Sequence, residues 1–361
     1  MSSFWKNKKV FITGHTGFKG SWLSFWLTSL GAKVYGYSLE PSTKDNLFKI
    51  LNIKDLIQLS EIGDICDMSN LKNSICNAQP QILFHLAAQP LVRISYDEPI
   101  ETLSTNIIGT ANVLESMRYC SSLRSSVMIT SDKCYENKER YESYSENDPM
   151  GGYDPYSVSK GCSELIVSSY RQSFFSEEAY PFHKNAIASA RAGNVIGGGD
   201  WSTDRLVPDA IKSFKEGKTL SIRNPTAVRP WQHVLEPLNG YMSLAQNLYT
   251  DGFLYASGWN FGPDDSDNVS VQDIVNLIIE NWPNDVSWKT NESKIKHEAN
   301  LLKLNCDKAK SLLGWKPIWS ASKAIEKTIL WHSALSANKD MYEFSLSQIN
   351  EYNQEYKKIN G

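Results

Sequence analysis

Short apolar stretches alternate with longer amphipathic stretches through the first half of the chain. The apolar stretches predict buried strands at residues 9–13, 33–37, 58–62, 82–86 and 127–130. Between them, apolar residues recur at helical spacing at residues 21–30, 68–77 and 100–119, and a helix at 157–175 and a strand at 186–191 continue the series. This alternation predicts a parallel sheet with right-handed crossovers, hence a doubly wound α/β domain.

The pattern changes after residue 191. A glycine-rich stretch occupies residues 193–201, and connections rich in Pro, Gly and Trp then separate predicted helices at 207–215, 235–248, 271–281 and 321–335. We expect a first domain over residues 1–190 with a return segment at about 232–262. A smaller, mixed α/β substrate-binding domain is expected at 191–231 and 263–340. Residues 341–361 are expected to form a C-terminal tail with a polar surface helix at 345–358.

Composition and charge narrow the range of functions. The 361 residues are 41% hydrophobic and 21% charged, as in ordinary globular proteins. A net charge of −3 gives no electrostatic reason to expect nucleic acid or an anionic membrane as a partner. The polar N-terminus runs directly into the first predicted strand, so we expect neither a signal peptide nor a membrane span, and a cytoplasmic protein. The six cysteines are scattered, so we expect reduced, mostly buried thiols and no metal site.

The first predicted strand leads into the stretch TGHTGFKG at residues 13–20. Its glycines form a G-x-x-G-x-x-G pattern between a strand and a helix. Such glycines allow a tight turn, and they let a pyrophosphate approach the N–H groups at the helix N-terminus. This pattern in this position predicts a Rossmann domain that binds a dinucleotide.

The choice between NAD and NADP is left open by the second predicted strand. That strand ends at Tyr37 and Ser38, and Glu40 comes two places late for an acidic residue on the adenine ribose. Asp64, after the third predicted strand, suits either an adenine contact or a solvated loop.

Tyr156 and Lys160 lie four residues apart at the start of a predicted helix, so they share one face. The lysine charge favours the phenolate form of the tyrosine, and the charge of an oxidised nicotinamide would add to that effect. A phenolate can accept the proton of a sugar hydroxyl while hydride leaves the carbon.

Three polar residues follow the fifth predicted strand: Ser131, Asp132 and Lys133. Ligands of open α/β sheets bind at the carboxyl ends of strands. Ser131 could donate a hydrogen bond to a sugar oxygen. Asp132 and Lys133 are either an additional acid and base or a local salt bridge in a charged loop.

Together with longer segments, these residues resemble one group of enzymes. The glycine turn, HLAAQ at 85–89, Asn106 within TNIIGT and the Tyr156/Lys160 pair resemble the extended short-chain dehydrogenase/reductases. More narrowly, the chain resembles the CDP-glucose 4,6-dehydratase family from about residue 8 to beyond 330. The segments that carry this likeness are GHTGFKGSWL (14–23), TSDKCY (130–135), GGYDPYSVSK (151–160), RAGNVIGGGDW (191–201) and RPWQHVLEP (229–237).

The resemblance implies a reaction and a role for each reactive residue. In that family C4 of the sugar is oxidised, water is eliminated across C5 and C6, and the hydride returns to C6. Tyr156 would be the base for the C4 hydroxyl, supported by Lys160 and Ser131. Asp132 would be the acid at the C6 hydroxyl, and Lys133 would remove the C5 proton. The resemblance also implies tightly held NAD, CDP-glucose as substrate, and a homodimer or homotetramer.

The same resemblance supplies the binding residues. Those expected at the cofactor are Gly14, Thr16, Gly17, Phe18, Lys19, Gly20, Asp64, Ile65, Leu86, Ala87, Ala88, Asn106, Thr130, Tyr156 and Lys160. Those expected at the substrate are Gln89, Arg93, Arg191, Asn194, Trp201, Arg205, Arg229 and His233. Guanidinium groups such as those of Arg205 and Arg229 match phosphate oxygens, whereas Trp201 either stacks on the base or fills the core.

Two other functions are compatible with the same fold. A nucleotide-sugar 4-epimerase or decarboxylase needs no acid and base beyond the tyrosine, so Asp132 and Lys133 favour elimination. A regulator that only binds a dinucleotide could lose Tyr156 or Lys160, and this chain keeps both. The sequence therefore predicts a nucleotide-sugar dehydratase.

Overall fold

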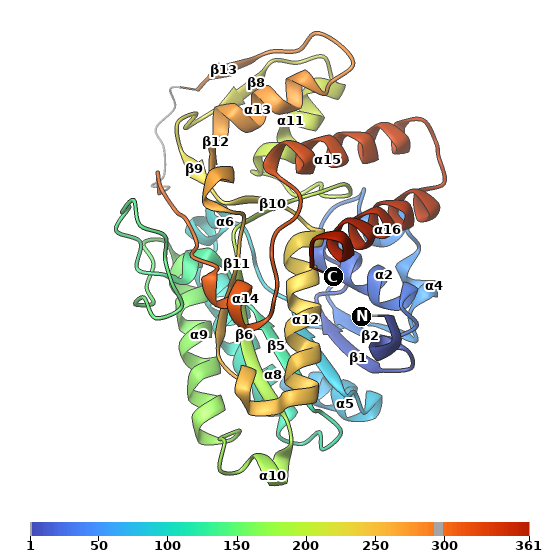
Figure 1. The fold of residues 1–361 in the computed structure, drawn as a ribbon, viewed down its shortest axis with the longest axis vertical. Helices are drawn as coiled ribbons and strands as arrows, with labels where there is room; N and C mark the ends of the chain where they lie inside the picture. Colours follow the sequence, from blue (N-terminus) through green and yellow to red (C-terminus); the bar gives the residue numbers. More distant parts are fainter. Residues whose placement is uncertain (1, 292–298, 361) are drawn as a thin grey trace.

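A seven-stranded parallel sheet forms the centre of the computed structural model, which describes residues 2–291 and 299–360 (Figure 1). Its order is β3-β2-β1-β4-β5-β6-β11, and every pairing is parallel. The strands are β1 (Lys9–Thr13), β2 (Lys33–Ser38), β3 (Leu59–Ile62), β4 (Ile82–His85), β5 (Ser125–Ile129), β6 (Ala186–Ala192) and β11 (Gly258–Phe261). The strand order reverses between β1 and β4, which opens a ligand crevice at the carboxyl edge. This topology confirms the doubly wound fold.

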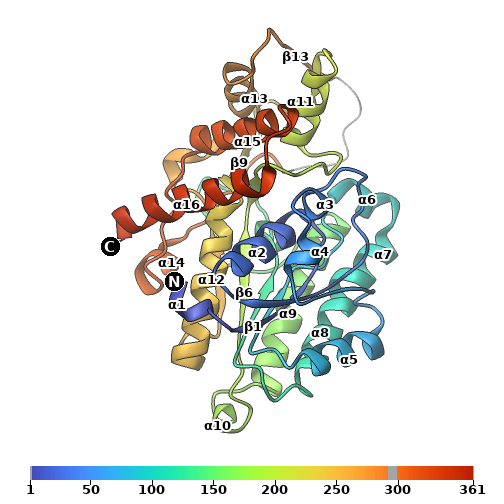
Figure 2. The same ribbon diagram turned by 90° about the vertical axis from the view of Figure 1, so that its right-hand side faces the viewer.

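Helices cover both faces of the sheet because successive strand residues point to opposite sides. On β1, Val10 and Ile12 join one buried cluster and Phe11 joins the other. The first face packs against α2 (Phe18–Ser29) and α12 (Leu235–Asp251). The second packs against α5 (Met68–Ala78), α8 (Gly109–Met117) and α9 (Pro155–Ser173). Figure 2 shows α12 and α5 on opposite sides of β1.

The helix expected at residues 100–119 is confirmed, because helical backbone runs without a break from Pro99 to Met117, and it contains one π-helical turn. It divides into α7 (Pro99–Leu103), a π-helical turn η1 (Ser104–Ile108) and α8. The carbonyl oxygen of Asn106 accepts hydrogen bonds from the hydroxyls of Thr110, at 2.6 Å, and Ser163, at 2.8 Å. These extra bonds favour a wider turn, and π-turns often occur at functional sites.

A second unit lies at the top of both ribbon views, beyond the carboxyl edge of the sheet. Its strands pair two by two: β7 (Asn194–Ile196) with β10 (Trp231–His233), β9 (Val228–Arg229) with β12 (Val269–Ser270), and β8 (Leu220–Ile222) with β13 (Trp288–Thr290). Its helices are α11 (Leu206–Lys215), α13 (Val271–Glu280) and α15 (Ala321–Ser336), which enclose a separate apolar cluster. Residues 292–298, within the expected substrate-binding domain, and residues 1 and 361 lie outside the described residues.

The C-terminal helix α16 (Met341–Asn360) is longer than expected, and one of its faces is buried. Ile349 and Tyr352 belong to the main apolar cluster, and the Tyr352 hydroxyl donates to Glu236 at 2.8 Å. The indole N–H of Trp331 donates to Ser345 at 2.9 Å. The prediction of a polar surface helix was therefore wrong for this face. The polar composition hid the spaced apolar positions.

The remaining elements are single turns that an apolar pattern does not resolve. They are α1 (Ser2–Trp5), α3 (Leu47–Ile50), α4 (Ile53–Leu56), α6 (Val92–Asp97), α10 (Tyr180–His183), α14 (Asp307–Leu312), and the 3-10 turns η2 (Asp132–Cys134), η3 (Gly252–Tyr255) and η4 (Asp265–Asp267).

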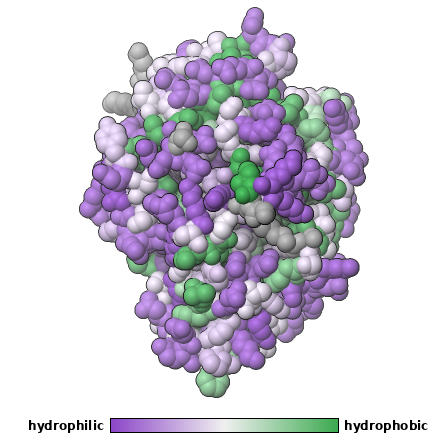
Figure 3. Space-filling view, in the orientation of Figure 1, coloured by the Kyte–Doolittle hydropathy of each residue, from purple (hydrophilic) through white to green (hydrophobic). Residues whose placement is uncertain are grey.

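Apolar residues on the molecular face in Figure 3 lie in small groups among hydrophilic ones, the usual composition of a protein surface. In the described part of the chain, no helix is both long and apolar enough to cross a membrane. All six cysteines are free thiols, but only Cys120, Cys134 and Cys306 are buried, so "mostly buried" was too strong.

Candidate active site

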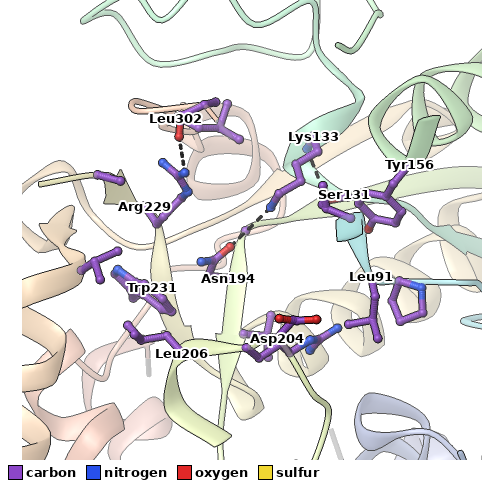
Figure 4. A pocket seen from close by; sticks show the side chains of 18 of the residues that line it. Leu91, Ser131, Lys133, Tyr156, Asn194, Asp204, Leu206, Arg229, Trp231 and Leu302 are labelled. Atoms are coloured by element: carbon purple, nitrogen blue, oxygen red, sulfur yellow. Dashed lines mark hydrogen bonds between the residues drawn. The ribbon is translucent and has the colours of Figure 1, made fainter. Parts of the chain in front are cut away.

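A cavity of about 920 Å³ lies between the carboxyl edge of the sheet and the second unit. Its volume is in the range of small-molecule sites. Figure 4 shows Ser131, Lys133 and Tyr156 on one side of it and Arg229 and Trp231 on the other. The first group comes from the sheet and α9, and the second from the short strands β9 and β10.

The glycine turn after β1 has the shape that a pyrophosphate requires. Gly14 has φ +80°, and a Cβ there would lie 2.6 Å from the Ala87 nitrogen. A Cβ on Gly20 would collide with the Gly14 carbonyl. Gly17 caps α2 without a side chain, so the first N–H groups of that helix are left for a ligand. The turn therefore fits a dinucleotide.

Most other residues expected at the cofactor follow strand ends on the same edge. Thr16 ties the turn to β2 through Ser38 Oγ, at 2.9 Å. Leu86, Ala87 and Ala88 follow β4, Thr130 follows β5, and Asp64 and Ile65 follow β3. The Asp64 carboxylate is exposed and accepts the N–H of Cys66 at 2.8 Å, while Ile65 is buried against Gly109. Phe18, in the first turn of α2, packs near Gly197.

The Asn106 side chain forms hydrogen bonds with two neighbouring segments at this edge. Its side-chain N–H groups donate to the Gln89 carbonyl, at 3.0 Å, and to Ser159 Oγ, at 2.8 Å. Its side-chain oxygen accepts the N–H of Gln89 at 2.9 Å. Asn106 thereby links the loop after β4 to the helix that carries Tyr156 and Lys160.

Tyr156 and Lys160 are buried on the inward face of α9. Asp154 caps this helix by accepting the Ser157 N–H at 2.9 Å, and Pro155 occupies its first position. Burial raises the pKa of Tyr156 to about 12, against the hydrogen bond from Ser131. Burial lowers the pKa of Lys160 to about 8. The expected lowering of the Tyr156 pKa is therefore not seen in the protein by itself, because burial outweighs the hydrogen bond with Ser131.

Ser131, Asp132 and Lys133 form a short turn with linked side chains. Ser131 Oγ donates to Asp132 Oδ1 at 2.9 Å, and Lys133 Nζ lies 3.5 Å from Asp132 Oδ1 and from Asn194 Oδ1. Asp132 is fully buried, and its Oδ2 has no hydrogen-bond partner within the described ranges. The acid and the lysine thus form a loose pair, and Ser131 and Lys133 face the cavity.

Lys19, in the first turn of α2, lines the same cavity. Burial lowers its pKa to about 7, and the positive charges of Arg205 and Lys160 add to the shift. Lys19 therefore belongs to a group of neighbouring cations that includes Arg205, Lys160 and Lys133.

Arginines from several segments also line the cavity. Arg93 on α6 and Arg223 after β8 both contact Asp204, at 3.2 and 3.3 Å. Arg205 lies 3.4 Å from Asp200. Arg229 donates to the carbonyl oxygens of Val228, at 2.9 Å, and of Ala299. Arg93, Arg205 and Arg229 were expected here.

Four residues expected at the substrate do not line the cavity, and their side chains have other partners; for Trp201 this is the core-filling alternative. Arg191 is buried in an ion pair with Glu164 at 2.8 Å. His233 is buried against Trp319, and burial lowers its pKa to about 3. Trp201 packs edge-on against Trp331 and His332. The Gln89 side chain bonds Thr102 Oγ1 and the backbone of Leu91.

Sequence reasoning missed Arg223, Asp204 and Trp231. The first two stand in connections without a recognisable pattern. Trp231 is buried and lines the cavity, and its indole N–H has no partner among residues 2–291 and 299–360. An aromatic residue inside the RPWQHVLEP segment was the available signal. Within the same described ranges, no group of three His, Cys, Asp or Glu residues could hold a metal ion.

Comparison with known sequences identifies the relatives of this chain. A family model described as GDP-mannose 4,6 dehydratase matches residues 11–328. The CDP-glucose 4,6-dehydratase of Salmonella typhimurium is 51% identical over 350 residues, which cover 97% of each chain. The dTDP-glucose 4,6-dehydratase of Shigella flexneri is 26% identical over 90% of this chain and 93% of its own.

Solved structures share the fold at lower identity. A UDP-glucose 4-epimerase of Thermotoga maritima superposes with a TM-score of 0.77 at 20% identity, covering 91% of this chain and 99% of its own. A dTDP-glucose 4,6-dehydratase of Streptomyces venezuelae, solved with NAD bound, has a TM-score of 0.76 at 19% identity, with 92% and 99% coverage.

Proposed function

The chain belongs to the GDP-mannose 4,6-dehydratase family, and on this basis we propose that it converts CDP-glucose to CDP-4-keto-6-deoxyglucose and water. The observation that carries the proposal is that Tyr156, Ser131 and Lys133 line the cavity together, with the buried Asp132 bonded to Ser131 and Lys133. The 51% identical relative supports CDP-glucose as the substrate.

The first half-reaction is assigned to α9 and the end of β5. Tyr156 accepts the proton of the C4 hydroxyl, and Ser131 holds the same oxygen by a hydrogen bond. The charge on Lys160 stabilises the phenolate that forms. Bound NAD would supply the redox chemistry by taking the hydride from C4 and returning it to C6. The turn with Gly14, Gly17 and Gly20 would hold its pyrophosphate.

The elimination is assigned to the turn η2. Once C4 is a ketone, the neighbouring C5–H bond is acidic, and Lys133 is assigned as the base that removes that proton. The C6 hydroxyl leaves as water with a proton from Asp132, so that the C5 hydrogen and the C6 hydroxyl are lost together. When the hydride returns to C6, Lys133 gives its proton back to C5, and this completes the 4-keto-6-deoxy product. Asp132 Oδ2 has no hydrogen-bond partner in the described part of the chain, so it is the oxygen assigned to the C6 hydroxyl.

The opposite end of the cavity is assigned to the nucleotide. Arg205 and Arg229 suit the diphosphate because each presents a planar fork of N–H groups. Asn194 lies between the two ends (Figure 4). Trp231, Leu220 and Ile222 supply an apolar wall for the nucleoside.

A homodimer, or a tetramer built from it, is part of the proposal. Ile100 on α7, Ile108 on η1 and Leu165 on α9 are 73%, 55% and 59% exposed, and α7 and η1 both pack beside α9. A partner copy would cover them. Leu165→Glu should give a monomer by sedimentation, whereas a monomeric unmodified protein would contradict this part. The free cysteines suit the reducing cytoplasm.

The direct test is to incubate the purified protein with NAD and CDP-, dTDP-, GDP- or UDP-glucose. A 4-keto-6-deoxy product from CDP-glucose, identified by mass and NMR, is expected. If the product is an epimer of the sugar nucleotide, the proposed reaction is wrong. If another nucleotide is preferred, the proposed substrate is wrong.

A further inference from the structure

The residues on either side of the Ser131–Asp132–Lys133 turn are both anchored inward. Thr130, before the turn, donates its hydroxyl to Glu164 Oε1 at 2.5 Å. Tyr135, after the turn, accepts a hydrogen bond from Arg191 Nη1 at 2.7 Å. The turn that the proposed function uses for acid–base chemistry is therefore held at both ends by charged side chains.

The two anchoring side chains are bonded to each other. Arg191 Nη2 donates to Glu164 Oε2 at 2.8 Å, so the path Thr130–Glu164–Arg191–Tyr135 closes around the turn. The network extends to neighbouring strands, since Ser189 on β6 donates to Glu164 at 2.6 Å and Tyr135 donates to Asn260 on β11 at 2.7 Å.

This pair is buried, with side-chain exposures of 6% for Arg191 and 4% for Glu164. Burial opposes ionisation of Glu164, but the guanidinium and the hydroxyl donors hold the pKa of its carboxyl below the usual value. Apolar residues of similar volume are often as stabilising as a buried ion pair. Stability alone therefore gives little reason to place these charges beside the reacting turn.

The Glu164–Arg191 pair is also close to Tyr156 and Lys160. Glu164 lies one helical turn after Lys160 and two turns after Tyr156 on α9, and its charge favours the charged form of Lys160. The buried Glu164 carboxylate is therefore next to Lys160, which is assigned to C4 oxidation, and next to the 131–133 turn, which is assigned to elimination.

We propose that Glu164 and Arg191 are positioning residues, which form a closed frame that sets the Asp132 and Lys133 side chains for elimination. This inference rests on the proposed function. The frame has separable ends: Tyr135 holds the side of the turn next to Lys133, whereas Thr130 holds the side next to Ser131.

The test removes one hydroxyl at a time, because Glu164→Gln would leave the buried Arg191 without its ion-pair partner, and misfolding would mask positioning. Loss of a hydrogen bond to a charged group is worth roughly 10- to 150-fold. In single turnovers of the NAD-bound enzyme, Tyr135→Phe should slow elimination by about 10-fold or more and C4 oxidation by less than about 3-fold. Thr130→Val should slow both steps.

The matched control is Tyr352→Phe, which removes another buried tyrosine hydroxyl bonded to a buried glutamate, on α16. It should lower the melting temperature and leave the ratio of the two rates unchanged. Equal slowing of both steps in Tyr135→Phe, or no slowing, would overturn the proposal.

Crystal structures of Tyr135→Phe and Tyr352→Phe separate this inference from the proposed function, since they need no turnover. Displacement of Asp132 and Lys133 in the first variant alone is expected. An unmoved turn would overturn the frame even in an active dehydratase, and a displaced turn in a protein that dehydrates no sugar would overturn only the proposed function.

Discussion

The two ends of the cavity are built differently. At the reacting end, Tyr156, Lys160 and Asp132 are at most 7% exposed, and they stand at strand ends or on a long helix. At the other end, the side chains of Arg93 and Arg205 are 34% and 32% exposed and paired with acids from connecting segments. Burial shifts the pKa values of Tyr156 and Lys160, whereas binding an anion needs only positive charge within reach. Substitutions should therefore change turnover at the first end and affinity at the second.

The largest effect is expected from Tyr156→Phe, which keeps the ring and removes the proton acceptor. General acid–base catalysis is typically worth roughly 10²–10⁴-fold, so C4 oxidation should slow by about that factor with little change in substrate affinity. Single-turnover absorbance of the reduced cofactor measures this step. Full activity of a folded Tyr156→Phe protein would contradict the role of the tyrosine.

Lys133→Ala should divide the reaction in two. C4 oxidation should continue because Tyr156 and Lys160 are untouched, and elimination should fall by roughly 10²–10⁴-fold because the base at C5 is gone. Reduced cofactor should accumulate in the near-ultraviolet spectrum, and exchange of the C5 hydrogen with solvent deuterium should largely cease. Normal exchange, or failure to reduce the cofactor, would show that another group is the base.

The kcat/KM of C4 oxidation should increase with pH and then become constant. The pKa of Tyr156 is raised to about 12 by burial, so its ionised fraction grows with pH over the whole working range. The pKa of Lys160 is about 8, so its charge is present below that pH and lost above it. The kcat/KM of C4 oxidation should rise by up to about tenfold per unit towards pH 8 and then stop rising. A fall between pH 6 and 8 would contradict this assignment.

The sequence predicted the reacting end well because strand ends and helix starts place side chains at fixed spacing. The glycine turn, the Tyr156/Lys160 pair and the turn at 131–133 could all be located from apolar patterns and short motifs, with the family resemblance supplying their roles. The parallel sheet with helices on both faces was predicted from the same alternation, whereas the order of its strands was not.

The nucleotide end was predicted only in part because burial cannot be read from residue type. Arg191 has the chemistry of a phosphate ligand, but it forms a buried ion pair with Glu164 on α9, which lies 27 positions earlier in the sequence. The ring of His233 likewise packs against Trp319, 86 residues later, and no local pattern in the sequence predicts this contact. Arg223 and Asp204 meet only because of the path of a connection.

Arg229→Ala should mainly weaken binding of the sugar nucleotide. A hydrogen bond to a charged group contributes about 1.5–3 kcal/mol, which is roughly 10- to 150-fold in KM, while kcat and cofactor content stay within about 3-fold. Arg229→Lys should recover part of the loss because it keeps the charge without the planar fork. Steady-state kinetics with CDP-glucose measure all three quantities.

Arg118→Ala is the control for net charge, because Arg118 lies on the far side of the sheet at the end of α8, 2.8 Å from Glu115. It should leave KM unchanged. Arg229 also holds the carbonyl oxygens of Val228 and Ala299, so a purely structural role is the alternative. That alternative predicts a lower melting temperature with an unchanged KM. In that case Arg229 only holds residues 299–302 in place, and its charge does not contact the substrate. A raised KM with an unchanged melting temperature assigns Arg229 to the diphosphate, and with it the difference between the two ends of the cavity.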